Sequence, residues 1–150
     1  MVRLRTARGG RFSRHARSFQ QPSTLHHQPL PMFPFERLDT WQVAVELADV
    51  IYRETKGFPP DERFGLTNQM RRAAVSVSAN RAEGSSRFSR TDFARFVEIA
   101  TGSLFEVVSQ SCVAKRQGFL AEEQFKMIYE RAEQLGRMLS GLHASLAAER

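Results

Sequence analysis

The side chains of this chain that are best suited to chemistry are arginines between residues 63 and 95. This stretch carries seven basic and two acidic residues, and Phe88 lies among them in an expected loop. Guanidinium groups bind phosphates, and exposed aromatic rings stack on unpaired bases. The pattern predicts a nucleic-acid-binding surface that consists of Arg63, Arg71, Arg72, Arg81, Arg87 and Arg90, with Arg95 beside them.

The same charges have a second interpretation. Residues 35–62 carry three basic and seven acidic residues, so an acidic segment precedes the basic one. If the acidic segment of one subunit met the basic segment of the next, the head-to-tail contact would close a ring. Both interpretations stay open, and both hold if only some arginines lie in the contact.

Two polar pairs lie three residues apart on neighbouring expected helices, Asn80 with Glu83 and Ser103 with Glu106. A polar side chain within an apolar stripe needs a hydrogen-bonding partner. We expect a structural network, in which Arg72 or Arg95 neutralises a carboxylate. Contact with a ligand is the alternative.

Catalytic constellations are missing from the sequence. Three of the four histidines precede residue 35, and His143 stands alone on the last expected helix. Glu-x-x-His pairs for a di-iron site and a Gly-rich phosphate loop are also missing. Cys112 is expected to pack near the core. The sequence predicts no enzyme, no cofactor and no metal.

Four amphipathic segments position these residues. Apolar residues recur at intervals of three and four, which places them on one side of a helix. The expected helices cover about residues 38–57, 62–83, 90–117 and 125–146. Short loops between them predict an all-α fold, an antiparallel up-down-up-down four-helix bundle in a domain at residues 35–150. No run of 18 apolar residues exists, so no membrane span is expected.

Three glycines have expected roles along these helices. Gly84 is expected to close the second helix as a left-handed cap, and Gly118 to end the third. Gly102 lies mid-helix, where glycine costs about 1 kcal/mol relative to alanine, so close approach of another helix is expected there. Asp61 and Ser89 are the expected N-caps of the second and third helices.

Residues 1–34 contain six arginines and no acidic residue, while the other 116 residues are electrically neutral. A segment so poor in aliphatic residues is expected to be disordered. It has three interpretations: a basic arm, an Arg-rich transit peptide, or translation from a start upstream of a true first residue at Met32.

Five motifs carry a resemblance to a known family. They are Phe35-x-x-Leu38-x-x-Trp41; Phe58-Pro59-x-x-Glu62-Arg63-x-x-Leu66-x-x-Gln69-x-x-Arg72-Ala73-Ala74-x-Ser76; Asn80-x-Ala82-Glu83-Gly84; Arg95-Phe96-x-x-Ile99-Ala100-x-Gly102-Ser103-Leu104-x-Glu106; and Leu135-Gly136-Arg137-Met138-Leu139. Together they resemble the four-helix bundle family named after the protein encoded in intervening sequences of 23S ribosomal RNA genes.

The resemblance implies a cytoplasmic bacterial protein that forms a homopentameric ring. A structurally similar relative, the accessory variability determinant protein of retroelements, forms such a ring and binds nucleic acid and a reverse transcriptase. By analogy, the expected partners are RNA or DNA and a nucleic-acid-processing protein. This chain departs from the family at Arg81, where an apolar residue is common, at Ala121, where Ser often caps the last helix, and in its Arg-rich tail.

The sequence thus predicts a non-enzymatic oligomer that binds nucleic acid through arginines. The alternative is a protein-interaction scaffold, or accessory subunit, whose charges serve ring assembly.

Overall fold

Apolar stripes at helical spacing bring four helices around one core, and the computed structural model describes residues 33–148. A short 3-10 helix, η1 (Pro34–Arg37), precedes α1 (Asp39–Glu54). Two further 3-10 helices, η2 (Thr55–Gly57) and η3 (Pro60–Phe64), lead to α2 (Leu66–Ser85). The chain continues with α3 (Arg90–Arg116) and α4 (Glu122–Ala148).

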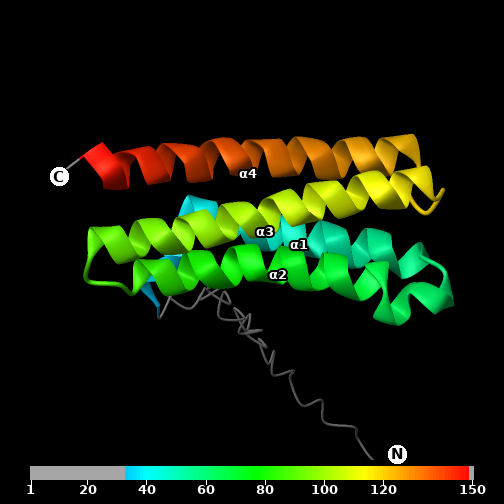
Figure 1. Ribbon diagram of the computed structural model, residues 1–150, viewed down its shortest axis with the longest axis horizontal. Helices are drawn as coiled ribbons and strands as arrows, with labels where there is room; N and C mark the ends of the chain where they lie inside the picture. Colours follow the sequence, from blue (N-terminus) through cyan, green and yellow to red (C-terminus); the bar gives the residue numbers. More distant parts are fainter. Residues whose placement is uncertain (1–32, 149–150) are drawn as a thin grey trace, which may run out of the picture.

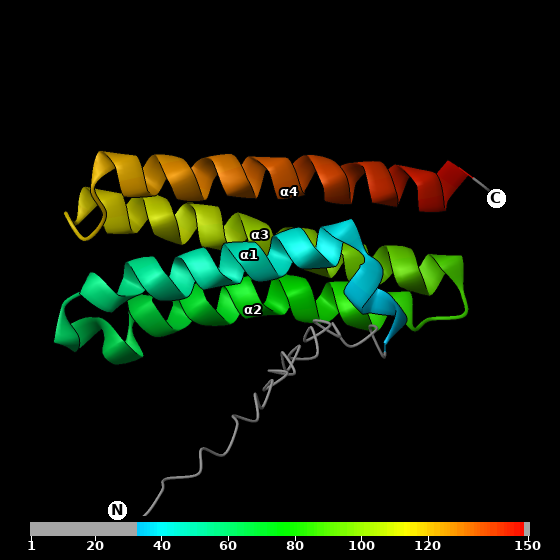
Figure 2. The ribbon, with the colours of Figure 1, turned by 180° about the vertical axis from the view of Figure 1, so that it is seen from behind.

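The helices form an antiparallel bundle in which each has two neighbours. Helix α3 packs against α2 and α4, and α1 packs against the same two helices from the other side. Figure 1 shows α2, α3 and α4 side by side. Figure 2 shows the bundle from the opposite side, where α1 lies between α2 and α4. The predicted all-α four-helix bundle is therefore confirmed. Within the described residues, no helix combines the length and the apolar character needed to cross a membrane.

The core is built from one apolar stripe on each helix. On α4 the buried stripe consists of Ile128, Ala132, Leu135, Leu139 and Leu146. On α1 the buried face is centred on Ala44, Leu47, Ala48 and Ile51, whereas Tyr52 is exposed.

Helix α2 begins later than predicted. A 3-10 turn covers the residues expected to open the helix, and Gly65 stands at its N-cap position. The carboxylate of Glu62 accepts a hydrogen bond from the backbone N–H of Leu66 at 2.8 Å. Glu62 therefore satisfies the first turn of α2, a role that the sequence had suggested for Asp61.

Of the three glycine predictions, one is confirmed and two are wrong. Gly118 ends α3 at a φ of 77°, as expected. Gly84 does not cap α2, because it lies inside the helix against α3. A Cβ there would meet Phe93 Cδ2 and Phe96 Cβ at 2.9 Å. Gly102 has no atom of the described residues within 4 Å of a Cβ, so the expected close approach does not occur within the described subunit.

The N-termini of α3 and α4 are both capped by side chains. Ser89 caps α3 as predicted, since its Oγ accepts from the N–H of Asp92 at 3.3 Å. At α4 the family-type serine is absent, but the side chain of Gln124 still accepts from the N–H of Ala121 at 2.8 Å. Half of a capping box therefore remains. The expectations for residues 1–32, including a start at Met32, lie outside the described residues.

Candidate nucleic-acid interface

The structure separates the predicted arginines into two groups at opposite ends of α2. Arg63, Arg71 and Arg72 lie at its beginning, and Arg87 and Arg90 lie in the turn to α3 and its start. A helix rises 1.5 Å per residue, so the stretch from Arg72 to the end of α2 spans about 20 Å. The arginines therefore do not form one continuous patch on a single subunit.

Arg81 belongs to neither group of arginines. Its burial corrects the prediction that it binds phosphate. Its side chain is only 4% exposed, and its Nε donates to Thr40 Oγ1 at 2.5 Å. Its guanidinium lies 5.1 Å from the centre of the Phe93 ring. One of the two terminal nitrogens, Nη1, is buried without a partner among the described residues. Burial lowers the pKa of the Arg81 guanidinium from its usual value. This cation is buried between α1, α2 and α3 and is unavailable to a nucleic acid.

Arg71 is half-buried and joins α2 to the end of α1. Its Nε donates to Thr55 Oγ1 at 2.8 Å, and its guanidinium lies 4.8 Å from the centre of the Tyr52 ring. The hydroxyl of Thr55 in turn donates to the carbonyl of Ile51 at 2.7 Å. Arg71 therefore contributes to the subunit's own structure.

Arg72 and Arg63 are the exposed cations at this end. Arg72 has no hydrogen-bond or ion-pair partner within residues 33–148. Arg63 lies over the ring of the adjacent Phe64, 5.3 Å from its centre. That ring is 84% exposed, so a cation and an accessible aromatic face occur together.

A polar groove of about 500 Å³ runs between α2 and α3 next to these residues. Two of its lining residues join the helices, since Ser76 Oγ lies 2.8 Å from Ser103 Oγ, and the Asn80 amide next to the groove donates to Ser76 Oγ at 3.0 Å. The groove is also lined by Phe64, Gln69, Arg72, Glu106 and Gln110. We call this feature the α2–α3 groove.

Two residues of the expected polar network meet in the structure and two do not. Asn80 and Ser103 meet through Ser76, a residue that the expected network did not include although it lies four residues before Asn80. Glu83 lies on the surface and pairs with Arg87. Glu106 has no hydrogen-bond or ion-pair partner in the described chain, so neither Arg72 nor Arg95 neutralises it.

The arginines at the other end of the bundle are partly engaged by the subunit itself. Arg87 pairs with Glu83 and lies 4.5 Å from the centre of the Phe96 ring. Arg90 donates to the carbonyl of Ser145 at 2.8 Å and so ties α3 to α4. Phe88, in the loop between these two arginines, is fully exposed, as predicted.

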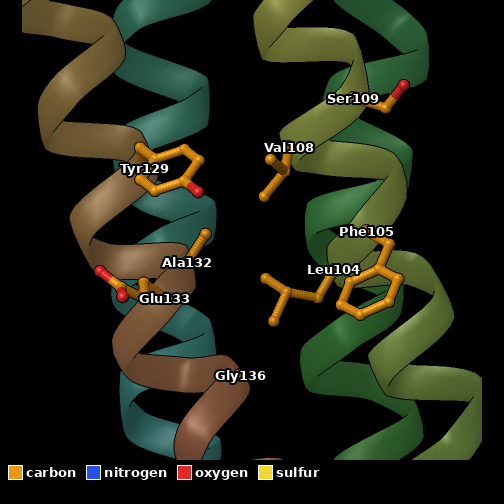
Figure 3. A pocket seen from close by; sticks show the side chains of 8 residues that line it. All are labelled: Leu104, Phe105, Val108, Ser109, Tyr129, Ala132, Glu133 and Gly136. Carbon is orange, nitrogen blue, oxygen red and sulfur yellow. The ribbon is translucent and has the colours of Figure 1, made fainter.

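An apolar groove of about 420 Å³ opens between α3 and α4, a feature that the sequence did not predict. Figure 3 shows Leu104 and Val108 of α3 pointing towards Tyr129 and Ala132 of α4. Phe105 at its edge is 68% exposed and Tyr129 is 48% exposed. The available signal was that these two large residues fall outside the core stripes of their helices. We call this feature the α3–α4 groove.

His143 and Cys112, the histidine and the cysteine of the described residues, lie on the surface. His143 Nε2 lies 2.7 Å from Glu98 Oε1 on the surface. Cys112 is exposed, so its expected place near the core is wrong. It directly follows the buried Ser111, and one residue turns a helix by about 100°, which carries Cys112 away from the core.

Comparison with known proteins gives one family and one similar fold. Residues 36–141 match the model of the family described as 23S rRNA-intervening sequence protein. The fold is similar to the crystal structure of a protein of unknown function from the S23 ribosomal protein family of Bacteroides thetaiotaomicron. The two share 21% identity at a TM-score of 0.63, over 69% of this chain and 97% of that chain. No curated protein matches the sequence.

Proposed function

This chain belongs to the 23S rRNA-intervening sequence protein family, and from that premise we propose that it is a non-enzymatic homo-oligomer that binds nucleic acid through the exposed arginines of η3 and α2. Its place of action in this proposal is the bacterial cytoplasm. The family match covers residues 36–141, so the proposal concerns the bundle and not the Arg-rich segment before it.

One observation carries the proposal: the exposed Arg72, which has no partner among residues 33–148, lines one polar groove together with the exposed ring of Phe64, and the exposed Arg63 lies over that ring. A guanidinium group without an acidic partner is free to neutralise a phosphate. An accessible aromatic ring beside them supplies a stacking surface for an unpaired base. The combination suits RNA or single-stranded DNA better than a duplex, whose bases are already stacked.

Oligomerisation adds to this binding. The family resemblance implies a homopentamer, and a ring of five subunits presents the same groove five times. Sites that are weak alone then act together, because each contact after the first is intramolecular. The proposal needs no strong single site.

The test is fluorescence anisotropy of labelled RNA and single-stranded DNA at low and physiological salt. The full chain is compared with a chain that starts at Met32. We expect the shorter chain to bind, with an affinity that falls steeply as salt rises. Binding by the full chain alone would assign the activity to residues 1–31 and contradict the proposal.

The α3–α4 groove supports a second candidate function, a scaffold that acts through protein contacts. An exposed apolar surface of this kind marks interaction sites in soluble proteins. The occupant that we propose is a second copy of this chain. Phe105→Ser combined with Tyr129→Ser should then lower the mass measured by sedimentation equilibrium. An unchanged mass would place the subunit contact elsewhere.

A further inference from the structure

The α2–α3 groove contains a carboxylate that a simple phosphate-binding surface does not need. Glu106 is exposed, has no partner in the described chain and lines the groove together with Arg72. A negative charge there repels phosphates and weakens nonspecific binding. Its position is explained if the groove takes a ligand that carries hydrogen-bond donors as well as negative charge.

The two sides of the groove differ in charge. The α3 side carries the exposed Glu106 carboxylate, which only accepts, and beside it Gln110 Oε1 is buried with no partner among residues 33–148. The α2 side carries the Arg72 guanidinium, which only donates, next to the amides of Asn68 and Gln69. A planar group with two donors and an adjacent acceptor on one edge would satisfy both sides.

Guanine is the base whose edge has this pattern. Its N1–H and its exocyclic amino group are adjacent donors, which the two oxygens of one carboxylate can accept together, and O6 beside them accepts from a guanidinium. Adenine and cytosine offer one amino group on this edge, and uracil offers one N–H. Single-stranded nucleic acids are read through such base edges, with an aromatic ring stacked on the base.

We propose that the α2–α3 groove selects guanine in single-stranded nucleic acid, a proposal that rests on the nucleic-acid binding proposed above. Glu106 accepts from N1–H and the amino group of the base, and Arg72 donates to O6 or to a neighbouring phosphate. The exposed ring of Phe64 at the rim stacks on the base. The Ser76–Ser103 hydrogen bond beneath holds the two sides of the groove in register.

The test uses the full chain and three labelled uridine-rich RNAs of equal length that contain one guanosine, one inosine or one adenosine. Inosine keeps N1–H and O6 and lacks only the exocyclic amino group. A hydrogen bond to a charged group is worth about a tenfold or larger factor in affinity. We therefore expect the guanosine RNA to bind about tenfold more tightly than the inosine RNA, and the adenosine RNA to bind still more weakly.

Glu106→Gln should abolish this preference and raise the affinity for the adenosine RNA, because the repelling charge is gone. Glu123→Gln removes the same charge from an exposed position at the start of α4 and should keep the preference. Circular dichroism and sedimentation equilibrium test whether both variants keep their fold and mass.

The outcomes separate the two proposals. Equal, salt-sensitive binding of all three RNAs would overturn guanine selection, and the chain that starts at Met32 would then show whether the bundle itself binds nucleic acid. Absence of binding to all three would overturn both. A change of mass in Glu106→Gln would place Glu106 in a subunit contact and overturn the groove's role in reading bases.

Discussion

Ser76 Oγ and Ser103 Oγ lie 2.8 Å apart and join α2 to α3 beneath the α2–α3 groove. Asn80 extends this pair by donating to both the carbonyl and the hydroxyl of Ser76. The hydrogen bonds satisfy three polar side chains between the two helices. They also fix which residues of the two helices face each other across the groove, and so place Arg72 near Glu106 and Gln110.

Replacing Arg71 should affect stability, because its guanidinium binds Thr55 and covers the ring of Tyr52. Arg71→Ala removes a hydrogen bond to a buried hydroxyl and a cation–π contact. We expect the free energy of unfolding to fall by about 1–2 kcal/mol, measured by urea denaturation. Arg71→Lys should restore only part of the loss, since an ammonium cannot reproduce the planar contact. An unchanged denaturation midpoint for Arg71→Ala would contradict this role.

Replacing Arg81 by an apolar residue should stabilise the bundle. Among residues 33–148 the buried guanidinium has a hydrogen bond to Thr40 and a terminal nitrogen without a partner, so its lost hydration is incompletely compensated. Arg81→Met keeps the length of the side chain without the charge. We expect about 1 kcal/mol of added stability and unchanged nucleic-acid affinity, measured by thermal unfolding and anisotropy. A lower melting temperature would mean that the contacts with Thr40 and Phe93 outweigh the cost of burial.

Two helical glycines should respond to alanine in opposite directions. A Cβ at Gly84 would meet Phe93 and Phe96 at 2.9 Å, whereas a Cβ at Gly102 has no neighbour in the described chain. Gly84→Ala should therefore destabilise by about 1–3 kcal/mol through overpacking. Gly102→Ala should stabilise by about 0.5–1 kcal/mol through helix propensity.

Urea denaturation of the two glycine variants, measured side by side, gives the sign of each change in the free energy of unfolding. The pair controls for the change itself, because the same atoms are added to two helices. If Gly102→Ala also lowered stability, and did so in step with a loss of mass, a second subunit would have to lie against α3 at this point.

The N-terminus of α4 should accept a better cap. Gln124 already binds the N–H of Ala121, but alanine has no oxygen to accept from the first turn of the helix. Ala121→Ser completes the capping box and should add about 0.5–1 kcal/mol. Ala121→Val, which adds side-chain atoms without an acceptor, serves as the control in the same thermal unfolding experiment. An equal effect of both substitutions would exclude capping as the cause.

The four-helix fold could be predicted from the sequence because the spacing of apolar residues along each helix determines which side is buried. The stripe of Ile128, Leu135 and Leu139 fixes the buried side of α4 whatever surrounds it. Arg81 shows the limit of this reasoning. It follows the buried Val77 by four residues, so its register placed it in the core, while its charge suggested the surface. The register was correct, because Thr40 and Phe93 surround the guanidinium.

Other features depended on distances between helices, which no local pattern contains. Glycine serves equally as a cap or as a point of close approach, so Gly84 and Gly102 could not be assigned from sequence alone. The α2–α3 groove combines Arg72 with Glu106 and Gln110, which are far apart in the chain. Arg72 and Glu106 were singled out in the sequence and Gln110 was not, and the relationship of the three to one another required the fold.

The most direct test of the central claim is the salt dependence of RNA affinity for the wild-type chain and Arg72→Ala. Arg131→Ala on α4 is the control, because it removes a surface arginine that pairs with Glu46 away from the groove. The account predicts weaker binding by Arg72→Ala and a slope of log affinity against log salt reduced by about 1, with Arg131→Ala like the wild type. Equal affinities and slopes for all three proteins would contradict a role of the η3–α2 arginines in binding nucleic acid.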